Sequence, residues 1–447
     1  MRLSLLDVRS LADRAAHMTK ADAAEAVVTS TTSALTRFAN NRIHQNVTET
    51  DTSVSIRAIL GQRTGVASTN RLDDESLARC ARSAVEAARH APEDPEFPGL
   101  PAPVAVGIGA RAETNTREYD AGRRAQAVTA IIEQSDSRGL VAAGTVALSD
   151  YAVAVASTLG VDAAMSADDI RATVLSMGSD GGSGWAAFLG NDASSFSPSS
   201  LGSRAAGIAE RSERPGPLDP GIYTVVLAPD AVSDILDFLG YVGFGAKPFA
   251  EGGSFLTDSL GKKIVDDRIS IYDDARSPGT VGLFFDFEGQ PKRHTPLIEG
   301  GIAVGPVTDS YFAAMLGRPN TGHALPAPNP YGPMPLNLEM AVGDTSTEAM
   351  IASVSRGVYV TRFHYVNVED PMKVVLTGMT RDGTFLIENG EITRPLRNLR
   401  FTQGALEALS HVGAVGSQRT LIGPGEGGAT LAPSLLLDRW EFTGQTD

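Results

Sequence analysis

The chain has 447 residues, of which 42% are hydrophobic and 20% charged, and it carries a formal net charge of −15. This length allows two or three domains that each bury a core, and the composition is ordinary for a soluble globular protein. Because an acidic surface repels a phosphate backbone and no Lys/Arg cluster offsets the charge locally, we expect no nucleic-acid partner.

Cysteine use and hydropathy indicate a cytoplasmic protein. The single cysteine, Cys80, excludes an intrachain disulfide, which suits a reducing compartment. The N-terminal segment carries charges throughout and lacks the apolar centre of a signal peptide. No uncharged apolar run reaches the roughly 18 residues that a membrane-spanning helix needs. We therefore expect a cytoplasmic location and no membrane partner.

The first seventy residues predict a helix followed by a β-meander. Residues 7–18 have helical spacing, with Asp7 as the expected cap. Residues 25–69 are rich in Val, Thr and Ile and predict several short strands. Hairpin turns are expected at residues 40–41, which are Asn-Asn, and at 61–62, which are Gly-Gln.

A second helix and a proline-rich connector come next. Asp73 is the expected cap of a helix that runs to about His90, and Cys80 lies on its apolar stripe as a buried structural thiol. A meander followed by a helix favours an antiparallel sheet covered on one face. Residues 92–103 hold five prolines and predict a stiff, extended connector.

The central region alternates helices and strands. We expect a helix near residues 118–134, strands between 140 and 178, and a helix over 199–212. The Gly-rich segment 178–184 lacks the Lys-Ser/Thr ending of a phosphate loop, so a flexible hairpin connection is the favoured interpretation. The breaker at 214–221 is the expected domain boundary.

The C-terminal half opens with a strand at 223–228 and a helix that begins at Pro229, with Asp230 as its expected cap. Many strands follow, including two predicted hairpins at 297–305 and 386–394. The apolar face of the helix has helical spacing and consists of Val232, Ile235, Leu236 and Leu239.

These features predict an α+β fold, with an N-terminal antiparallel sheet under covering helices and a strand-rich C-terminal domain. We divide the chain into an N-terminal α+β domain (1–91), a connector (92–112), a central α+β region packed on the N-terminal domain (113–213), and a β-rich C-terminal domain (221–447).

Residue types alone give no self-evident catalytic constellation. The seven histidines include no two within five residues, so no local metal-binding pair exists. Asp273 and Asp274 could converge with Asp286 and Glu288 on a hard cation. The favoured interpretation is that the first two begin a turn and that Asp286 and Glu288 share a solvated strand face.

Three longer segments carry a family resemblance. Residues 286–323, which begin Asp-Phe-Glu-Gly and end Thr-Gly-His, resemble the TldD/PmbA family. The match continues through 356–401, and the meander at 33–70 is similar to the first domain of that family. The resemblance covers nearly the whole chain and implies the fold of that family, with a C-terminal domain of the TldD/PmbA type.

The resemblance also implies which site to look for. Members similar to TldD are zinc metallopeptidases with a His-Glu-x-x-x-His motif on a helix of the C-terminal domain and a later Cys ligand. Here the corresponding positions hold Asp237, Phe238 and Val242, and no cysteine follows Cys80. This pattern resembles the PmbA (TldE-type) branch, which implies no cofactor in this chain and zinc in a catalytic partner.

The resulting hypothesis is a non-catalytic subunit that forms a heterodimer with a TldD-like metallopeptidase acting on unfolded peptides. Peptide or partner contacts are expected in segments 318–323 and 357–368. The candidate contact residues are Thr321, Gly322, His323, Thr361 and Arg362.

Two alternatives stay open at this point. The chain could be a homodimeric peptide-binding or scaffold protein without a protease partner. It could also be a self-sufficient hydrolase with a non-standard site built from Asp237, Asp286, Glu288 and His323.

Overall fold

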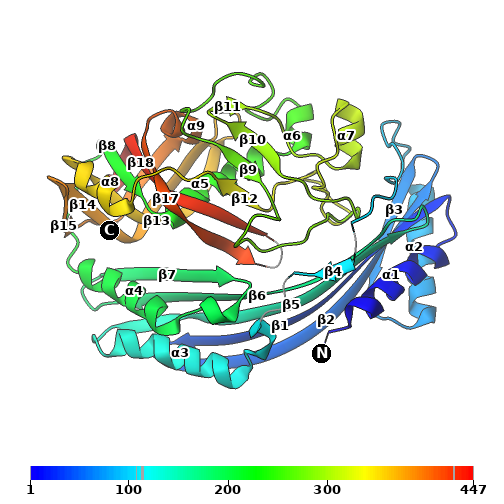
Figure 1. Cartoon of the computed structure of the whole chain (residues 1–447), viewed down its shortest axis with the longest axis horizontal. Helices are drawn as coiled ribbons and strands as arrows, with labels where there is room; N and C mark the ends of the chain where they lie inside the picture. The colour runs from blue at the N-terminus through cyan, green and yellow to red at the C-terminus, as the bar shows by residue number, and fades with distance from the viewer. Residues whose placement is uncertain (1, 107, 112–114, 426–427, 446–447) are drawn as a thin grey trace.

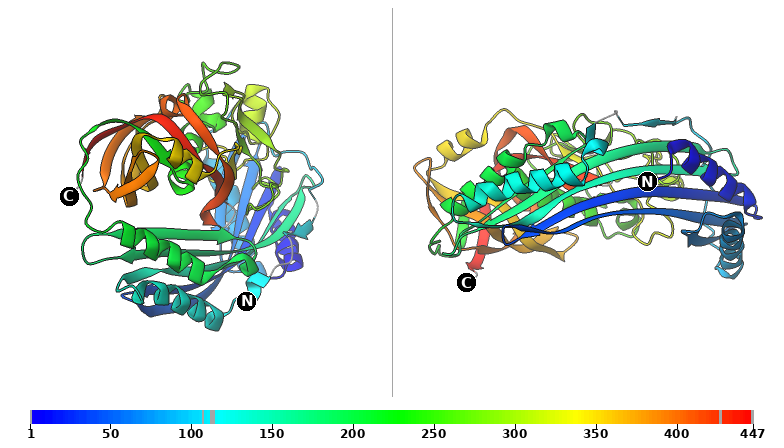
Figure 2. Two further views of the ribbon diagram at one scale, coloured as in Figure 1. Left: turned by 60° about the vertical axis from the view of Figure 1, so that its left-hand side comes forward. Right: turned by 90° about the horizontal axis from the view of Figure 1, so that it is seen from below.

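The computed structural model describes residues 2–106, 108–111, 115–425 and 428–445, and within them the strands form two sheets. The first sheet has seven strands and the second has eleven. The second sheet and its loops lie over one face of the first, which is long and curved (Figures 1 and 2). Residues 107 and 112 of the predicted connector, and 113–114 after it, lie outside the described residues.

The N-terminal sheet has the order β3-β2-β1-β5-β6-β4, with β7 also paired to β6. All of its pairs are antiparallel except β4 with β6. Its strands are β1 (Ala23–Ala39), β2 (Arg42–Leu60), β3 (Arg63–Thr69), β4 (Ile108–Ala110), β5 (Val141–Ser157), β6 (Asp162–Met177) and β7 (Ser183–Gly190).

The short strands predicted between residues 25 and 60 are in fact two long ones, β1 and β2, whereas the short strand predicted at the end of this segment is confirmed as β3. The β1–β2 pairing runs from Ala23 opposite Ile59 to Ala39 opposite Arg42, with one irregularity beside Arg37. The predicted turn is confirmed, since Asn40 has a φ of 51° and Asn41 a φ of 58°. Two successive positive φ angles are the geometry of a type I′ hairpin turn, which asparagine tolerates.

Alternation along the strands gives the two faces of this sheet different partners. Ala152 and Ala154 of β5 pack against helices, whereas Val153 and Val155 pack against Phe285 of the C-terminal half. Period-2 geometry therefore places the helices on one face and the C-terminal half on the other. The covering helices are α1 (Leu5–Met18), α2 (Asp74–His90), α3 (Ala121–Asp136) and α4 (Pro198–Arg211) (Figure 2).

Helix caps show how far local sequence determines these elements. Asp73 caps α2, as predicted, by accepting a hydrogen bond of 2.9 Å from the backbone N–H of Ser76. The predicted cap Asp7 is wrong: α1 begins after Ser4, and Asp7 completes a capping box by accepting from the Ser4 backbone N–H. Reciprocal bonds of this kind satisfy two amides that the helix leaves free.

The C-terminal sheet has the order β11-β10-β9-β12-β18-β16-β14-β13-β8, with β15 on β14 and β17 on β18. Both predicted hairpins are confirmed, as β10–β11 and β14–β15. Its strands are β8 (Gly221–Leu227), β9 (Ile271–Asp273), β10 (Thr295–Glu299), β11 (Ile302–Ala303), β12 (Leu338–Met340), β13 (Arg356–Asp370), β14 (Val375–Glu388), β15 (Glu391–Pro395), β16 (Leu399–Gly404), β17 (Val412–Gly425) and β18 (Gly428–Gln445). The helices of this half are α5 (Pro229–Val242), α6 (Ala246–Ala250), α7 (Ser310–Leu316), α8 (Thr347–Ser353) and α9 (Ala405–Leu409).

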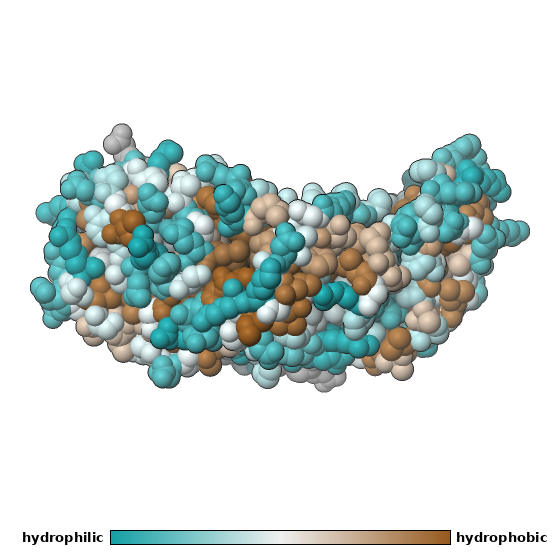
Figure 3. Space-filling view, turned by 90° about the horizontal axis from the view of Figure 1, so that it is seen from above, coloured by the Kyte–Doolittle hydropathy of each residue, from teal (hydrophilic) through white to brown (hydrophobic). Residues whose placement is uncertain are grey.

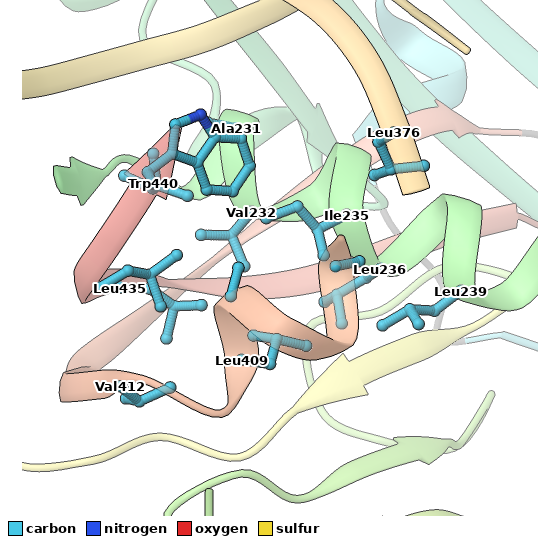
Figure 4. Packing of buried hydrophobic residues seen from close by; sticks show 14 of the residues in the cluster. Ala231, Val232, Ile235, Leu236, Leu239, Leu376, Leu409, Val412, Leu435 and Trp440 are labelled. Atoms are coloured by element: carbon cyan, nitrogen blue, oxygen red, sulfur yellow. The ribbon is translucent and has the colours of Figure 1, made fainter. Parts of the chain in front are cut away.

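Helix α5 lies at the centre of the C-terminal core. Its predicted apolar face is fully buried and packs against side chains from the strands around it, including Leu435 and Trp440 (Figure 4). The predicted cap Asp230 is wrong, because the helix begins after Ala228 with Pro229 in its first turn. Proline suits that position because its missing N–H would have no partner there.

The molecular surface has a hydrophobic region among its hydrophilic residues. Seen from above, hydrophobic residues gather near the middle of the elongated face, and hydrophilic residues dominate its two ends (Figure 3). None of the helices in the described part of the chain combines the length and the apolar character needed to cross a bilayer.

Candidate functional site

The polar face of α5 carries three carboxylates on the side opposite the core. Asp230, Asp234 and Asp237 follow a spacing of i, i+4 and i+7, so they share one face of the helix. Burial raises the pKa of Asp234 to about 7, and the neighbouring Asp237 adds to this rise while Arg362 of β13 opposes it. The face is therefore acidic and partly desolvated, with Arg204 and Arg362 as nearby cations.

The three positions that correspond to the His-Glu-x-x-x-His motif do not form a metal site in this chain. Asp237 is exposed, although the protein around it raises the pKa of its carboxyl by desolvation, and its Oδ1 accepts a hydrogen bond of 2.6 Å from Thr430 Oγ1. Phe238 and Val242 are half-buried and pack against the C-terminal core. Residues five apart on a regular helix point about 140° away from each other. Since α5 is α-helical through Val242, Asp237 and Val242 diverge.

No other group takes over this role in the described ranges. Among residues 2–106, 108–111, 115–425 and 428–445, no three His, Cys, Asp or Glu side chains converge so that they could hold a metal ion.

A second cluster of ionisable residues lies where the Thr-Gly-His segment meets β9. His323 and Asp273 are both buried, and His323 Nε2 lies 2.9 Å from Asp273 Oδ1. Because a carboxylate only accepts, Nε2 carries a proton, and Nδ1 lies 2.9 Å from Thr321 Oγ1. Burial lowers the pKa of His323, although Asp273 opposes this shift. Against its own burial, His323, Lys292 and the Asn337 amide lower the pKa of Asp273 to about 2.

The Asp-Phe-Glu-Gly segment forms a tight turn beside this pair. The expectation that Asp286 and Glu288 share a solvated strand face is wrong, because both are buried. Asp286 Oδ1 accepts from the backbone amides of Glu288 and Gln290, and its Oδ2 accepts from that of Ala324 at 2.9 Å. Burial, together with Glu288, raises the pKa of Asp286. Asp286 thus ties this turn to the segment that carries His323.

An ion-pair bridge joins the turn to the N-terminal sheet. Arg57 of β2 lies 3.2 Å from Glu288 Oε1 and 3.1 Å from Glu25 Oε1 of β1. The side chains of Glu25 and Glu288 are 3% and 8% exposed, so the bridge is shielded from water. Burial raises the pKa of Glu25 to about 7 although Arg57 opposes this shift. The family motif at 286–289 therefore fastens the two halves of the molecule together.

Several hollows border this junction. One, of about 240 Å³, is mostly apolar; we call it the motif cavity. Its wall consists of Leu283, Phe285, Asp286, Phe287, Lys292, His323, Ala324, Met334, Leu336, Pro424, Gly425 and Gly428. A larger hollow, of about 590 Å³, includes Arg57, Glu288, Asp309 and Tyr311 in its wall and shares Ala324 with the motif cavity.

The remaining predicted contact residues lie elsewhere. Thr361 is buried and its Oγ1 lies 3.0 Å from the carbonyl oxygens of both Asp382 and Gly383. Arg362 pairs with Asp382 at 2.9 Å and lies over the ring of Trp185 in β7, 4.4 Å from its centre. Arg362 thus joins β13 to β7, whereas Thr361 is bound within the C-terminal sheet. Of Thr321, Gly322 and His323, the last forms part of the wall of the motif cavity.

Sequence reasoning missed Glu25, Arg57, Lys292 and Asn337 as parts of this region. Arg57 meets Glu288 across 231 positions of the chain, and Lys292 Nζ donates to Asn337 Oδ1 across 45. No local pattern marks such contacts. Asp309, which caps α7 by accepting from the Phe312 amide, precedes a helical segment and could have been found by its spacing.

Comparison with known families identifies the chain. Residues 220–444 match the model described as the PmbA/TldA metallopeptidase C-terminal domain, and residues 24–88 match PmbA/TldA metallopeptidase domain 1. The chain belongs to the PmbA/TldD metallopeptidase family.

Curated relatives align with parts of the chain. A metalloprotease of Methanothermobacter thermautotrophicus is 27% identical over 222 residues, which are 48% of each protein. The metalloprotease PmbA of Escherichia coli O157:H7 is 28% identical over 187 residues, 41% of this chain and 39% of that protein. The TldD homologue of Haemophilus influenzae is 27% identical over 174 residues, 38% of this chain and 35% of that protein. The alignments thus span about half or less of these relatives.

Solved structures share the whole fold. TldE from Thermococcus kodakarensis superposes with a TM-score of 0.88 at 19% identity, over 99% of this chain and 100% of that one. A putative modulator of DNA gyrase from Thermotoga maritima gives a TM-score of 0.81 at 20% identity, over 94% and 96% of the two chains.

Proposed function

We propose that this chain is a non-catalytic, TldE-like subunit that pairs with a TldD-type zinc metallopeptidase and helps to enclose unfolded peptides. The observation that carries the proposal is the residue content of α5 at the positions where catalytic relatives are expected to hold zinc. A fold shared with TldE of Thermococcus kodakarensis across 99% of the chain is what a common subunit role predicts.

The chemistry of α5 supports the absence of catalysis. A catalytic zinc ion takes three protein ligands and keeps a further position for water, which a nearby carboxylate then deprotonates. Asp237 offers one carboxylate, one oxygen of which already accepts from Thr430. Phe238 and Val242 offer no ligand and no general base, and both pack into the core.

The test is to purify this chain alone and with a TldD-type subunit that carries an intact His-Glu-x-x-x-His motif. We expect a one-to-one complex in size-exclusion chromatography with light scattering, and about one zinc ion per complex by elemental mass spectrometry. The isolated chain should hold less than a tenth of an equivalent of zinc and should not cut an unfolded peptide. Stoichiometric zinc with peptidase activity in the isolated chain would overturn the proposal.

The same preparations separate the two alternatives. A homodimeric scaffold protein gives only self-dimers when mixed with the TldD-type subunit. A self-sufficient hydrolase cuts peptides without any partner, and it loses that activity in Asp237→Ala. For the self-sufficient hydrolase, Asp286→Asn is compared with Asp237→Ala. It tests the buried carboxylate of Asp286, whose oxygens already accept hydrogen bonds from three backbone amides.

A further inference from the structure

The motif cavity contains one ionic group whose hydrogen-bonding capacity is largely unused. Lys292, which is 6% exposed, contributes to its wall. Its Nζ donates to Asn337 Oδ1 at 3.1 Å, and no described carboxylate forms an ion pair with it. An ammonium group has three donors, and taking it out of water is expensive when they lack acceptors. Two donors of this buried cation therefore have no acceptor in the described protein.

The other polar groups of the wall are already committed. Asp286 accepts three backbone amides, and both ring nitrogens of His323 are engaged by Asp273 and Thr321. Asn337 is held in place because its Nδ2 donates to the Val281 carbonyl and its backbone N–H donates to Asp273. Lys292 is consequently the group in this wall that can still donate hydrogen bonds to an incoming partner, and an anion bound there would share its charge with Asp273.

The rest of the wall selects an apolar body. Most of its side chains are apolar: Leu283, Phe285, Phe287, Ala324, Met334, Leu336 and Pro424. A volume of about 240 Å³ lies below the roughly 300–1,000 Å³ typical of sites for drug-sized ligands. It exceeds the cavity of about 150 Å³ that is known to hold benzene in an engineered protein core. The space therefore suits one apolar side chain together with a carboxylate.

The cavity also lies close to the polar face of α5. Gly428 of β18 forms part of its wall, and Thr430 of the same strand binds Asp237 on α5. Residues two apart on a strand face the same side, about 7 Å from each other. A peptide bound along this part of β18, beside Asp237, can thus place its last residue in the motif cavity.

We propose that the motif cavity binds the C-terminal residue of a peptide, with the apolar side chain in the hollow and the terminal carboxylate on Lys292. This binding mode specifies which part of a peptide the proposed subunit recognises. It rests on the proposed function only in taking the ligand to be a peptide. The charge of Lys292 and the apolar wall define the shared chemistry, which a free N-acylated amino acid also possesses.

The experiment is calorimetric titration of the isolated full chain with an unfolded decapeptide that ends in leucine. We expect binding with the free carboxylate and at least tenfold weaker binding when the C-terminus is amidated. Lys292→Met should lose at least tenfold for the free acid, and amidation should then have no further effect. Lys262→Met removes an exposed lysine and serves as the matched control, with unchanged affinity.

Further variants and ligands make every outcome decisive. Circular dichroism shows whether Lys292→Met folds. If it does not, Met334→Trp provides an independent test, because it fills the hollow and should weaken binding of the free acid. N-acetyl-leucine should compete if the carboxylate and side chain suffice, and failure to compete means that the peptide chain itself is required. Equal affinity for acid and amide, or no detectable binding by the folded parent chain, would refute the proposal. Complex formation with a TldD-type subunit, measured separately, tells this failure apart from a failure of the proposed function.

Discussion

The bridge made by Arg57 allows a quantitative prediction about how the two halves of the molecule are joined. Arg57→Met removes the cation between Glu25 and Glu288, which lie 3.1 and 3.2 Å from it and are almost inaccessible to water. Breaking a buried ion pair from one side typically destabilises a protein by about 3–5 kcal/mol. We expect a loss of about this size in the free energy of unfolding at pH 8.

The loss should depend on pH in a definite direction. A stranded carboxylate can become neutral, and this costs about 1.4 kcal/mol for each pH unit above its unfolded pKa. For a glutamate with an unfolded pKa near 4.3, that amounts to about 5 kcal/mol at pH 8 but only about 1 kcal/mol at pH 5. The pKa of Glu25 is already raised to about 7 by burial, so its folded form takes up a proton readily. The destabilisation by Arg57→Met should therefore shrink to about 1–2 kcal/mol at pH 5.

Guanidinium unfolding at the two pH values measures this difference. Arg63→Met is the matched control, because the Arg63–Glu93 pair is 41% and 66% exposed and should contribute less than about 1 kcal/mol at either pH. Adding Glu288→Gln to Arg57→Met removes one stranded charge and should recover part of the loss at pH 8. Equal losses at both pH values, or a loss no larger than that of the control, would refute the reasoning.

Three further predictions concern α5 and the buried aspartate. Leu236→Ala should lower the free energy of unfolding by about 2–5 kcal/mol, because Leu236 is 0% exposed. Guanidinium unfolding followed by Trp440 fluorescence measures this loss. The control Leu6→Ala, at a position 68% exposed, should change the free energy of unfolding by less than about 0.5 kcal/mol. The pKa of Asp273 falls from 3.8 to about 2 on folding, so its charge stabilises the folded protein above pH 4. About 2 kcal/mol of this stability should be lost as the pH falls from 4 to 2. Thermal melts of Asp273→Asn should lack this acid-induced loss. Asp237→Ala should change peptidase activity of the assembled complex by less than about twofold, because loss of a group that takes no part in chemistry leaves the barrier intact; a drop of a hundredfold would assign Asp237 a catalytic role.

The elements that sequence predicted well are those fixed by contacts within a few residues. Asp73 and the apolar stripe around Cys80 define α2 from local spacing, and the hairpin turn at Asn389 and Gly390 needs only the left-handed preference of those two residues. The apolar face of α5 was predicted for the same reason. Its cap was not, because Pro229 permits a helix start without any side-chain acceptor.

The elements that sequence missed depend on contacts between distant segments. The long strands β1 and β2 contain many Thr and Ser residues that interrupt the apolar alternation, and only their continuous pairing shows that they do not end. Asp286 and Glu288 alternate as a solvated strand face would, yet Arg57 and the Ala324 amide make burial possible. Lys292 shows no pattern at all, since its environment is created by loops that meet only in the folded chain.

The most direct test of the account uses one complex with two versions of the TldD-type partner. The first partner is intact, and the second has the Glu of its His-Glu-x-x-x-His motif replaced by Gln, so that zinc stays bound while the general base is lost. Peptidase activity is measured on the same unfolded peptide with equal amounts of this chain. We predict full activity with the intact partner and none above background with the variant. Residual turnover that persists with the variant partner and disappears in Asp237→Ala of this chain would contradict the account.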